Sequence, residues 1–320
     1  MNKVKRIYEN KVKNINDIAL FIKQNNLGDV YKSIPFSKMT TLKIGGNIEL
    51  LYFPNSINSF IKVLKLIRKN NIEYFLIGNG SNVLANDNPY KGIVINLREI
   101  DFKYKLKDNY VIVSAGMGIA KLIFSLMKYD IGGLEFLIGI PGTIGGMIYM
   151  NAGAYGHNIS EYIIELRVID KDNNIKVLKR EELEFSYRDS TIKENNMIVL
   201  DAKIKVERKE KEKIKEEIKF YLENRKENQP LQHYNAGCTF KNKDISSWKL
   251  IDEVGCRGFR IGDAGVSEKH ANFLINYGNS SAFEMMNLIN YLKHKVRDEK
   301  NIELDCEWVF VNFDFAENEV

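Results

Sequence analysis

The sequence predicts a mixed fold of helices and strands that is divided into two or three domains. Its 320 residues exceed the usual size of a single hydrophobic core. Stretches with apolar residues at helical spacing alternate with short apolar stretches typical of strands. Apolar residues make up 44% of the chain and charged residues 28%, as in folded globular proteins.

The predicted elements follow one another along the whole chain. A helix with an apolar face is expected behind Asn55 and Ser56, and the strand after it delivers the glycine-rich loop of EYFLIGNGSNVLA. A strand interrupted by a double glycine is expected over 40–54. The remaining predictions are helices at 17–25, 119–129, 208–228, 246–254 and 282–297, and strands at 93–97, 102–106, 110–115, 162–170, 174–180, 197–206, 273–276 and 302–313.

Charge and cysteine content exclude several classes of protein. The net charge of +5 is dispersed over lysines interleaved with glutamates, which disfavours a nucleic-acid partner and suits an anionic, phosphorylated ligand. Cys238, Cys256 and Cys306 have neither disulfide nor metal-site spacing, so no metal is expected. No signal peptide or membrane span is visible, so we expect a cytoplasmic protein without a membrane partner.

Two glycine-rich stretches indicate a phosphorylated ligand. GNGSN, residues 78–82, follows a strand and offers backbone N–H groups that no side chain covers. By itself it fits a tight turn as well, because it matches neither GxGxxG nor a nucleoside-triphosphate loop. IPGTIGG, residues 140–146, presents further amides where a helix begins, although a packed helix start has the same pattern. Together they favour a large phosphorylated cofactor.

Four polar side chains are candidates for chemistry, each with a structural alternative. Cys238 lies in the polar stretch NAGCTFKN, although a free cysteine is often a small buried apolar residue. Arg188 in SYRDS could pair with Asp189. Glu307 lies among apolar neighbours, and His270 precedes a strand, where a surface or capping role is common.

A set of ordered motifs resembles the UDP-N-acetylenolpyruvoylglucosamine reductase (MurB) family. The motifs, which span about residues 40–309, are TLKIGG, GNGSN, GLEFLIGIPGTIGG, MNAGAYG, FSYRDS, AGCTFKN, VSEKHANFLIN and ELDCEWVF. The resemblance implies an α+β protein with a two-domain FAD-binding module of the vanillyl-alcohol-oxidase or PCMH-like type and a smaller α+β substrate-binding domain. The implied ranges are 16–90 and 91–228 with 301–320 for the FAD-binding subdomains, and 229–300 for the substrate-binding domain.

The resemblance also implies the reaction and its cofactors. NADPH would reduce a bound FAD, which would reduce the enolpyruvyl group of a UDP-sugar to UDP-N-acetylmuramate for peptidoglycan, and the protein would be a monomer. An oxygen-dependent flavin oxidase of the same FAD-binding fold and a non-catalytic nucleotide-sugar binding protein are the alternatives. The implied FAD-binding residues are Gly78, Asn79, Gly80, Ser81, Asn82, Gly139, Pro141, Gly142, Thr143, Gly145 and Gly146.

Finally, the family's motifs imply catalytic and substrate-binding residues. Arg188 would stabilise an enolate and Glu307 would assist as an acid or through a water molecule. Cys238 stands where most members carry a serine proton donor, and the proton-donor role is carried over to its thiol. Asn242 and His270 would contact the substrate, although the proline that usually follows the asparagine is absent here.

Overall fold

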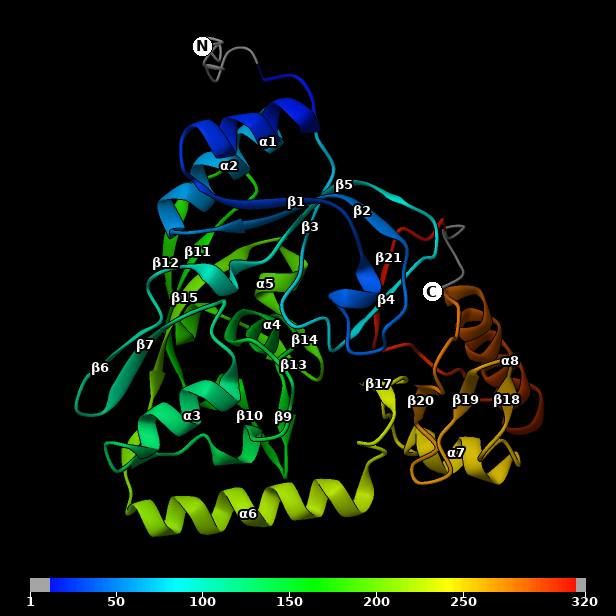
Figure 1. Ribbon diagram of the computed structural model, residues 1–320. Coiled ribbons are helices and arrows are strands. Elements are labelled where there is room, and N and C mark those ends of the chain that lie inside the picture. The colour runs from blue at the N-terminus through cyan, green and yellow to red at the C-terminus, as the bar shows by residue number, and fades with distance from the viewer. Residues whose placement is uncertain (1–11, 315–320) are drawn as a thin grey trace. The chain divides into compact units, whose positions relative to one another are not determined.

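The computed structural model describes residues 12–314 (Figure 1) and divides into two compact units. Within the described residues, the first unit comprises 12–34, 48–78 and 91–221. The second unit comprises 35–47, 79–90 and 222–314. Both units are therefore built from segments that are far apart in the sequence. No helix among residues 12–314 combines the length and the apolar character needed to cross a membrane.

The first unit holds most of a four-stranded sheet in the order β1-β2-β5-β3. Its strands are β1 (Gly28–Pro35), β2 (Asn47–Pro54), β5 (Tyr90–Ile95) and β3 (Tyr74–Leu76). The helices α1 (Ile15–Gln24) and α2 (Ile57–Lys69) pack against each other. As predicted, α2 begins behind Ser56, whose side chain accepts a hydrogen bond from Ser59 N.

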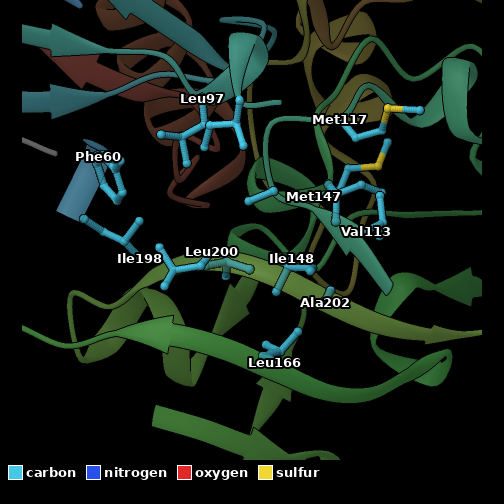
Figure 2. Close-up of a cluster of buried hydrophobic side chains, with 14 of the residues drawn as sticks. Phe60, Leu97, Val113, Met117, Met147, Ile148, Leu166, Ile198, Leu200 and Ala202 are labelled. Carbon is cyan, nitrogen blue, oxygen red and sulfur yellow. The ribbon is translucent and has the colours of Figure 1, made fainter. Parts of the chain in front are cut away.

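A second sheet of the first unit has five antiparallel strands in the order β12-β11-β15-β7-β6. The strands are β6 (Tyr104–Leu106), β7 (Tyr110–Ser114), β11 (Ile163–Ile169), β12 (Ile175–Lys179) and β15 (Ile198–Lys205). The predicted hairpin of β11 and β12 is confirmed. The short helix α4 (Ile144–Tyr149) lies against β7 and β15. Figure 2 shows its Met147 and Ile148 in the core with Val113 and Ala202 of these strands.

Smaller elements complete the first unit. The helix α3 (Ile119–Met127) begins at its predicted start, and α6 (Lys211–Asn228), of which residues 211–221 belong to this unit, begins later than predicted. The others are β8 (Ile131–Gly132) with β16 (Glu207–Arg208), β9 (Gly153–Ala154) with β10 (His157–Asn158), β13 (Phe185–Ser186) with β14 (Asp189–Ser190), α5 (Thr191–Glu194), and the 3-10 turns η3 (Leu97–Glu99), η4 (Glu135–Leu137), η5 (Ile159–Glu161) and η6 (Arg180–Glu182).

The second unit contains a four-stranded sheet in the order β17-β20-β19-β18. The strands are β17 (Tyr234–Cys238), β18 (Arg260–Ile261), β19 (Ala264–Val266) and β20 (Phe273–Asn276). Two helices belong to this unit, α7 (Ser247–Glu253) and α8 (Ala282–Lys300), together with the turn η2 (Phe36–Lys38). The predicted apolar face of α8 is confirmed, because its residues Met285, Leu288, Ile289, Leu292 and Val296 are all buried in the core.

Two predicted strands are wrong over much of their length. The strand expected over 40–54 begins only at Asn47, directly after the double glycine. Gly45 has φ +120°, and a Cβ on Gly46 would lie 2.0 Å from Asp87 O, so the chain cannot continue as an ordinary strand. The strand expected over 302–313 is reduced to β21 (Val309–Val311).

The last strand pairs with a segment more than 200 residues earlier in the sequence. β21 pairs in parallel with β4 (Val83–Ala85). Val309 N also donates to Asn82 O at 2.9 Å, just before β4, which extends this pairing. The predicted domain ranges stay a prediction, and residues 315–320 of the last range lie outside the described residues.

Candidate active site

The first residue of the GNGSN loop packs against the second glycine-rich loop. Gly78 follows β3, and a Cβ at this position would lie 2.5 Å from Thr143 Oγ1. The carbonyl oxygen of Gly78 accepts a hydrogen bond of 2.7 Å from the Nδ2 of Asn96, a buried side chain. Only glycine leaves room for this approach, so the first unit brings the two predicted cofactor loops into contact.

The second loop ends in a capped helix start. The Oγ1 of Thr143 accepts from Gly146 N at 3.4 Å, which makes it the N-cap of α4. A Cβ on Gly145 would lie 2.9 Å from the Cβ of Ala115, so this glycine also permits close packing. The loop and the start of α4 carry the remaining predicted cofactor residues, which all lie in the first unit: Gly139, Pro141, Gly142, Thr143, Gly145 and Gly146.

The rest of the GNGSN loop belongs to the second unit. Gly80 has φ +61°, and a Cβ there would lie 2.2 Å from Met39 O. Across residues 12–314, the backbone N–H groups of Asn79, Gly80 and Ser81 donate to no protein acceptor. Unpaired backbone donors on a loop without obstructing side chains suit a phosphate oxygen. These residues therefore fit the pyrophosphate of a dinucleotide cofactor.

Arg188 lies at the tip of a very short hairpin in the first unit. The strands β13 and β14 pair Phe185 with Ser190 and Ser186 with Asp189, which leaves Tyr187 and Arg188 as the turn. Arg188 has φ +58°, a left-handed conformation that is uncommon for a residue with a side chain. Its guanidinium carbon lies 5.2 Å from the ring centroid of Tyr187. Such conformations are frequent at functional sites, and the catalytic role of Arg188 stays a prediction.

Cys238 ends β17 in the second unit and lies opposite Phe273 of β20. The preceding Gly237 has φ +77°, and a Cβ added to it would meet no atom within 4 Å. The backbone just before the thiol therefore borders open space. Thr239, in contrast, is fully buried, and its Oγ1 accepts from Leu274 N at 3.3 Å. Of these two neighbours, the thiol is the side chain that lies outside the core.

Glu307 is held beside the segment that follows β17. Its backbone N–H donates to Thr239 O at 2.8 Å. Its carbonyl oxygen accepts from the Nδ2 of Asn82, the last residue of GNGSN, at 3.0 Å. Two hydrogen bonds to the backbone of Glu307 therefore fix its position within the second unit. This arrangement brings Cys238, Glu307 and the end of the GNGSN loop onto neighbouring segments.

One residue that holds this arrangement was missed by the sequence analysis. Asn272 is fully buried, and its Oδ1 accepts from Phe240 N at 2.9 Å while its Nδ2 donates to Phe240 O at 2.8 Å. The carboxamide thus replaces a strand partner for the segment just after Cys238. An asparagine between two apolar residues in KHANF was the available signal, because a buried amide must find hydrogen-bond partners.

The two predicted substrate-binding residues have structural contacts of their own. The Oδ1 of Asn242 accepts from Ser247 N at 3.0 Å, at the start of α7. The ring of His270 lies 4.9 Å from that of Phe273 and 6.4 Å from that of Trp248, measured between centroids. Burial lowers the pKa of His270, which favours the neutral imidazole. Their contact with a substrate stays a prediction.

The structure groups the predicted residues into two sets, one in each unit. The first unit holds Gly78, the IPGTIGG loop and Arg188. The second unit holds residues 79–82, Cys238, Asn242, His270 and Glu307. Each set is ordered by hydrogen bonds that reach across the sequence within its own unit.

Family models match both parts of the chain. A model described as an FAD binding domain matches residues 48–179. The C-terminal domain of UDP-N-acetylenolpyruvoylglucosamine reductase matches residues 229–311. Together with the fold, these matches define an FAD-binding α+β protein with a smaller C-terminal domain, which confirms the predicted class and its flavin cofactor.

Whole-chain relatives identify the family. UDP-N-acetylenolpyruvoylglucosamine reductase of Clostridium tetani is 40% identical over 276 residues, covering 86% of this chain and 90% of the relative. That of Caldanaerobacter subterraneus is 37% identical over 278 residues, covering 87% and 92%. The crystal structure of the enzyme (MurB) from Thermus caldophilus has a TM-score of 0.75 and 31% identity, covering 89% of this chain and 99% of that one. The chain belongs to the UDP-N-acetylenolpyruvoylglucosamine reductase (MurB) family, as predicted.

Proposed function

We propose that this protein reduces enolpyruvyl-UDP-N-acetylglucosamine to UDP-N-acetylmuramate for peptidoglycan synthesis, with bound FAD and with NADPH as the hydride donor. The observation that carries the proposal is the pairing of the Cys238 segment with Glu307 through the bond from Glu307 N to Thr239 O, 2.8 Å. Relatives at 40% identity carry the name of this reductase. We also propose that the protein works in the cytoplasm as a monomer, without a membrane or nucleic-acid partner, and the dispersed net charge of +5 supports the absence of a nucleic-acid partner.

The glycine loops are the proposed cofactor-binding residues. The N–H groups of Asn79, Gly80 and Ser81 would bind the pyrophosphate, and within the first unit the close approach of Gly78 to Thr143 supports the second glycine-rich loop. When bound, FAD supplies the hydride that reduces the substrate. The protein's own contribution is to orient the substrate, to stabilise charge and to deliver a proton.

Arg188 stabilises the negative charge that the reaction creates. A hydride that reaches the methylene carbon of the enolpyruvyl group leaves an electron pair on the neighbouring carbon, next to the carboxylate. The guanidinium is always charged and offers several N–H donors in one plane, so it suits an enolate conjugated with a carboxylate. The turn conformation of Arg188, with φ +58°, fixes the direction in which this side chain leaves the backbone.

Cys238 donates the proton that completes the product. Its Sγ–H bond breaks as a C–H bond forms at the carbon that bears the enolate charge, and the thiolate is reprotonated before the next turnover. Glu307 assists this step as an acid or through a bound water molecule. A thiol has an ordinary pKa of about 8.5, so it gives up a proton more readily than a serine hydroxyl.

The test separates the two half-reactions of Cys238→Ala in an anaerobic stopped-flow instrument. Reduction of the flavin by NADPH is expected to stay unchanged, because it needs no proton from Cys238. Reoxidation of the flavin by the enolpyruvyl substrate is expected to slow by about 10²- to 10⁴-fold, the usual contribution of a general acid. Cys238→Ser is expected to keep substrate reduction, because a hydroxyl group can also donate the proton.

Cys306→Ala is the matched control, because this cysteine is also half-buried in the second unit. It should leave both half-reactions unchanged. Substrate reduction at the wild-type rate in Cys238→Ala would show that the thiol is not the proton donor. A colourless wild-type protein, or reduced flavin that the substrate does not reoxidise, would refute the proposed function itself.

A further inference from the structure

The helix α4 ends at an asparagine in a left-handed conformation. Asn151 has φ +42°, and its N–H donates to Ile148 O at 3.2 Å. The next N–H, of Ala152, donates to Met147 O at 2.8 Å. These two bonds form the Schellman motif, in which glycine is the usual residue at the left-handed position. A residue other than glycine at this position therefore calls for a structural explanation.

Other helix ends show that asparagine alone is not unusual in this chain. Asn26, Asn71 and Asn196 have φ of +52°, +50° and +50° and follow α1, α2 and α5 in the same way. All of these side chains are exposed. Asn151 differs from them because it is only 5% exposed. Its carboxamide is buried, so it must be used in a contact or cost stability.

The buried carboxamide holds the hairpin that carries Arg188. The Nδ2 of Asn151 donates to Ser186 O at 2.8 Å, directly before the turn. On the other strand, the Oγ of Ser190 donates to Tyr149 O at 2.9 Å. Both strands of the hairpin are thus bonded to the C-terminal end of α4, which lies beside β14 (Figure 1). The hairpin itself has only two residue pairs, so these external bonds decide where its turn lies.

We propose that Asn151 is a positioning residue that holds the Arg188 turn in place for enolate stabilisation, an inference that rests on the proposed function. Asn151 touches no reacting atom and acts through the carbonyl group of Ser186. The same α4 begins at Thr143, in the predicted cofactor loop. One short helix therefore fixes the position of a cofactor loop at its start and of the Arg188 hairpin at its end.

The variant Asn151→Gly removes the carboxamide and keeps the left-handed helix end, because glycine adopts this conformation without strain. Asn196→Gly is the matched control, since it makes the same change at an exposed helix end in the same unit. We expect Asn151→Gly to slow substrate reduction by about 5- to 10-fold, which corresponds to one neutral hydrogen bond. Flavin reduction by NADPH should be unchanged in both variants, and Asn196→Gly should match the wild type throughout.

A double-mutant cycle distinguishes positioning from a general loss of structure. If Asn151 acts through Arg188, then Asn151→Gly should slow substrate reduction much less in an Arg188→Lys protein, whose side chain lacks the planar fork of the guanidinium. A loss of stability alone would reduce both half-reactions and would act equally in either background. Equal losses in the two backgrounds, or equal rates for Asn151→Gly and Asn196→Gly, would overturn the proposal.

Hydrogen exchange tests the same contact without relying on turnover. Amide exchange in residues 185–190 of the flavin-loaded protein should become faster in Asn151→Gly and stay unchanged in Asn196→Gly. Unchanged exchange in both variants would show that the contact does not hold the hairpin, whatever the kinetics. If the wild-type protein fails to reduce the UDP-sugar, the proposed function is refuted, and this measurement still decides whether Asn151 fixes the turn.

Discussion

Replacing Gly78 with alanine should damage the contact between the two cofactor loops. Gly78 is not in the left-handed region, so the backbone tolerates a side chain and the penalty is steric alone. The new Cβ would lie 2.5 Å from Thr143 Oγ1, whereas the Cβ and Cγ2 of Thr143 are both at 3.5 Å, an ordinary contact distance. Thr143 must therefore move its hydroxyl and weaken its bond to Gly146 N. We expect a loss of about 1 to 3 kcal/mol in the free energy of unfolding, as for other overpacked sites.

The same geometry predicts how a second substitution relieves the first. Thr143→Ala alone should cost about 1 kcal/mol, the value of a lost helix cap. In the double variant the clashing oxygen is absent, and the nearest remaining atom of residue 143 is its Cβ, at 3.5 Å from the added Cβ. The double variant should therefore be no less stable than Thr143→Ala, which gives a coupling energy of about 1 to 3 kcal/mol.

Urea unfolding followed by circular dichroism measures these free energies, and flavin absorbance of the purified proteins reports cofactor retention. Gly78→Ala should lose flavin more readily than the wild type. Gly146→Ala is a control in the same loop, since its Cβ would lie 3.4 Å from Thr143 Oγ1 and alanine favours the helix by about 1 kcal/mol. The reasoning would be refuted if the double variant lost the sum of the two single-variant losses in free energy of unfolding, or if Gly78→Ala were as stable as the wild type.

Three further predictions concern stability and thiol reactivity. Asn272→Ala should lower the free energy of unfolding by about 2 to 5 kcal/mol, because it leaves Phe240 N and O unpaired in the core, and thermal unfolding measures the loss. A lysine ammonium and a backbone N–H lower the pKa of Asp170 to about 2. The ionised Asp170 carboxylate therefore stabilises the folded protein above its ordinary pKa of 3.8, and this stabilisation is lost as the pH falls toward 2. In Asp170→Asn, the midpoint of urea unfolding should change less with pH over that range. Burial raises the pKa of Cys306 to about 11, so its thiol should react slowly with maleimide at pH 8. Cys238 should therefore be labelled before Cys306, and mass spectrometry of peptides measures the order.

The helices were predicted best because their signals are local. Ser56 caps α2, and the apolar face of α8 repeats at helical spacing, so both elements are determined by neighbours in the sequence. Strand ends were predicted less well, because pairing with distant segments decides them. The strand β1 was missed, and β21 is short, since its extent depends on β4, more than 200 residues earlier.

In the candidate site too, local features could be predicted from the sequence and long-range contacts could not. The ordered motifs select Arg188, Cys238 and Glu307 as candidates, because the proposed chemistry requires particular side chains, and their catalytic roles stay predictions. The residues that hold them in place escaped notice. Asn272 and Asn151 act through backbone atoms of segments that are distant in the sequence, so the apolar neighbours of Asn272 could indicate that it is buried but not which segment it bonds.

The pairing of β4 with β21 has a consequence for synthesis on the ribosome. Among residues 12–314, β21 is the partner that the structure gives to β4, and it is translated more than 200 residues after β4. The nascent chain must therefore expose the unpaired edges of Val83–Ala85 until Val309–Val311 have been made. A chain that stops before Val309 would keep this edge open, so premature termination should yield an aggregating product rather than a shorter, well-folded one.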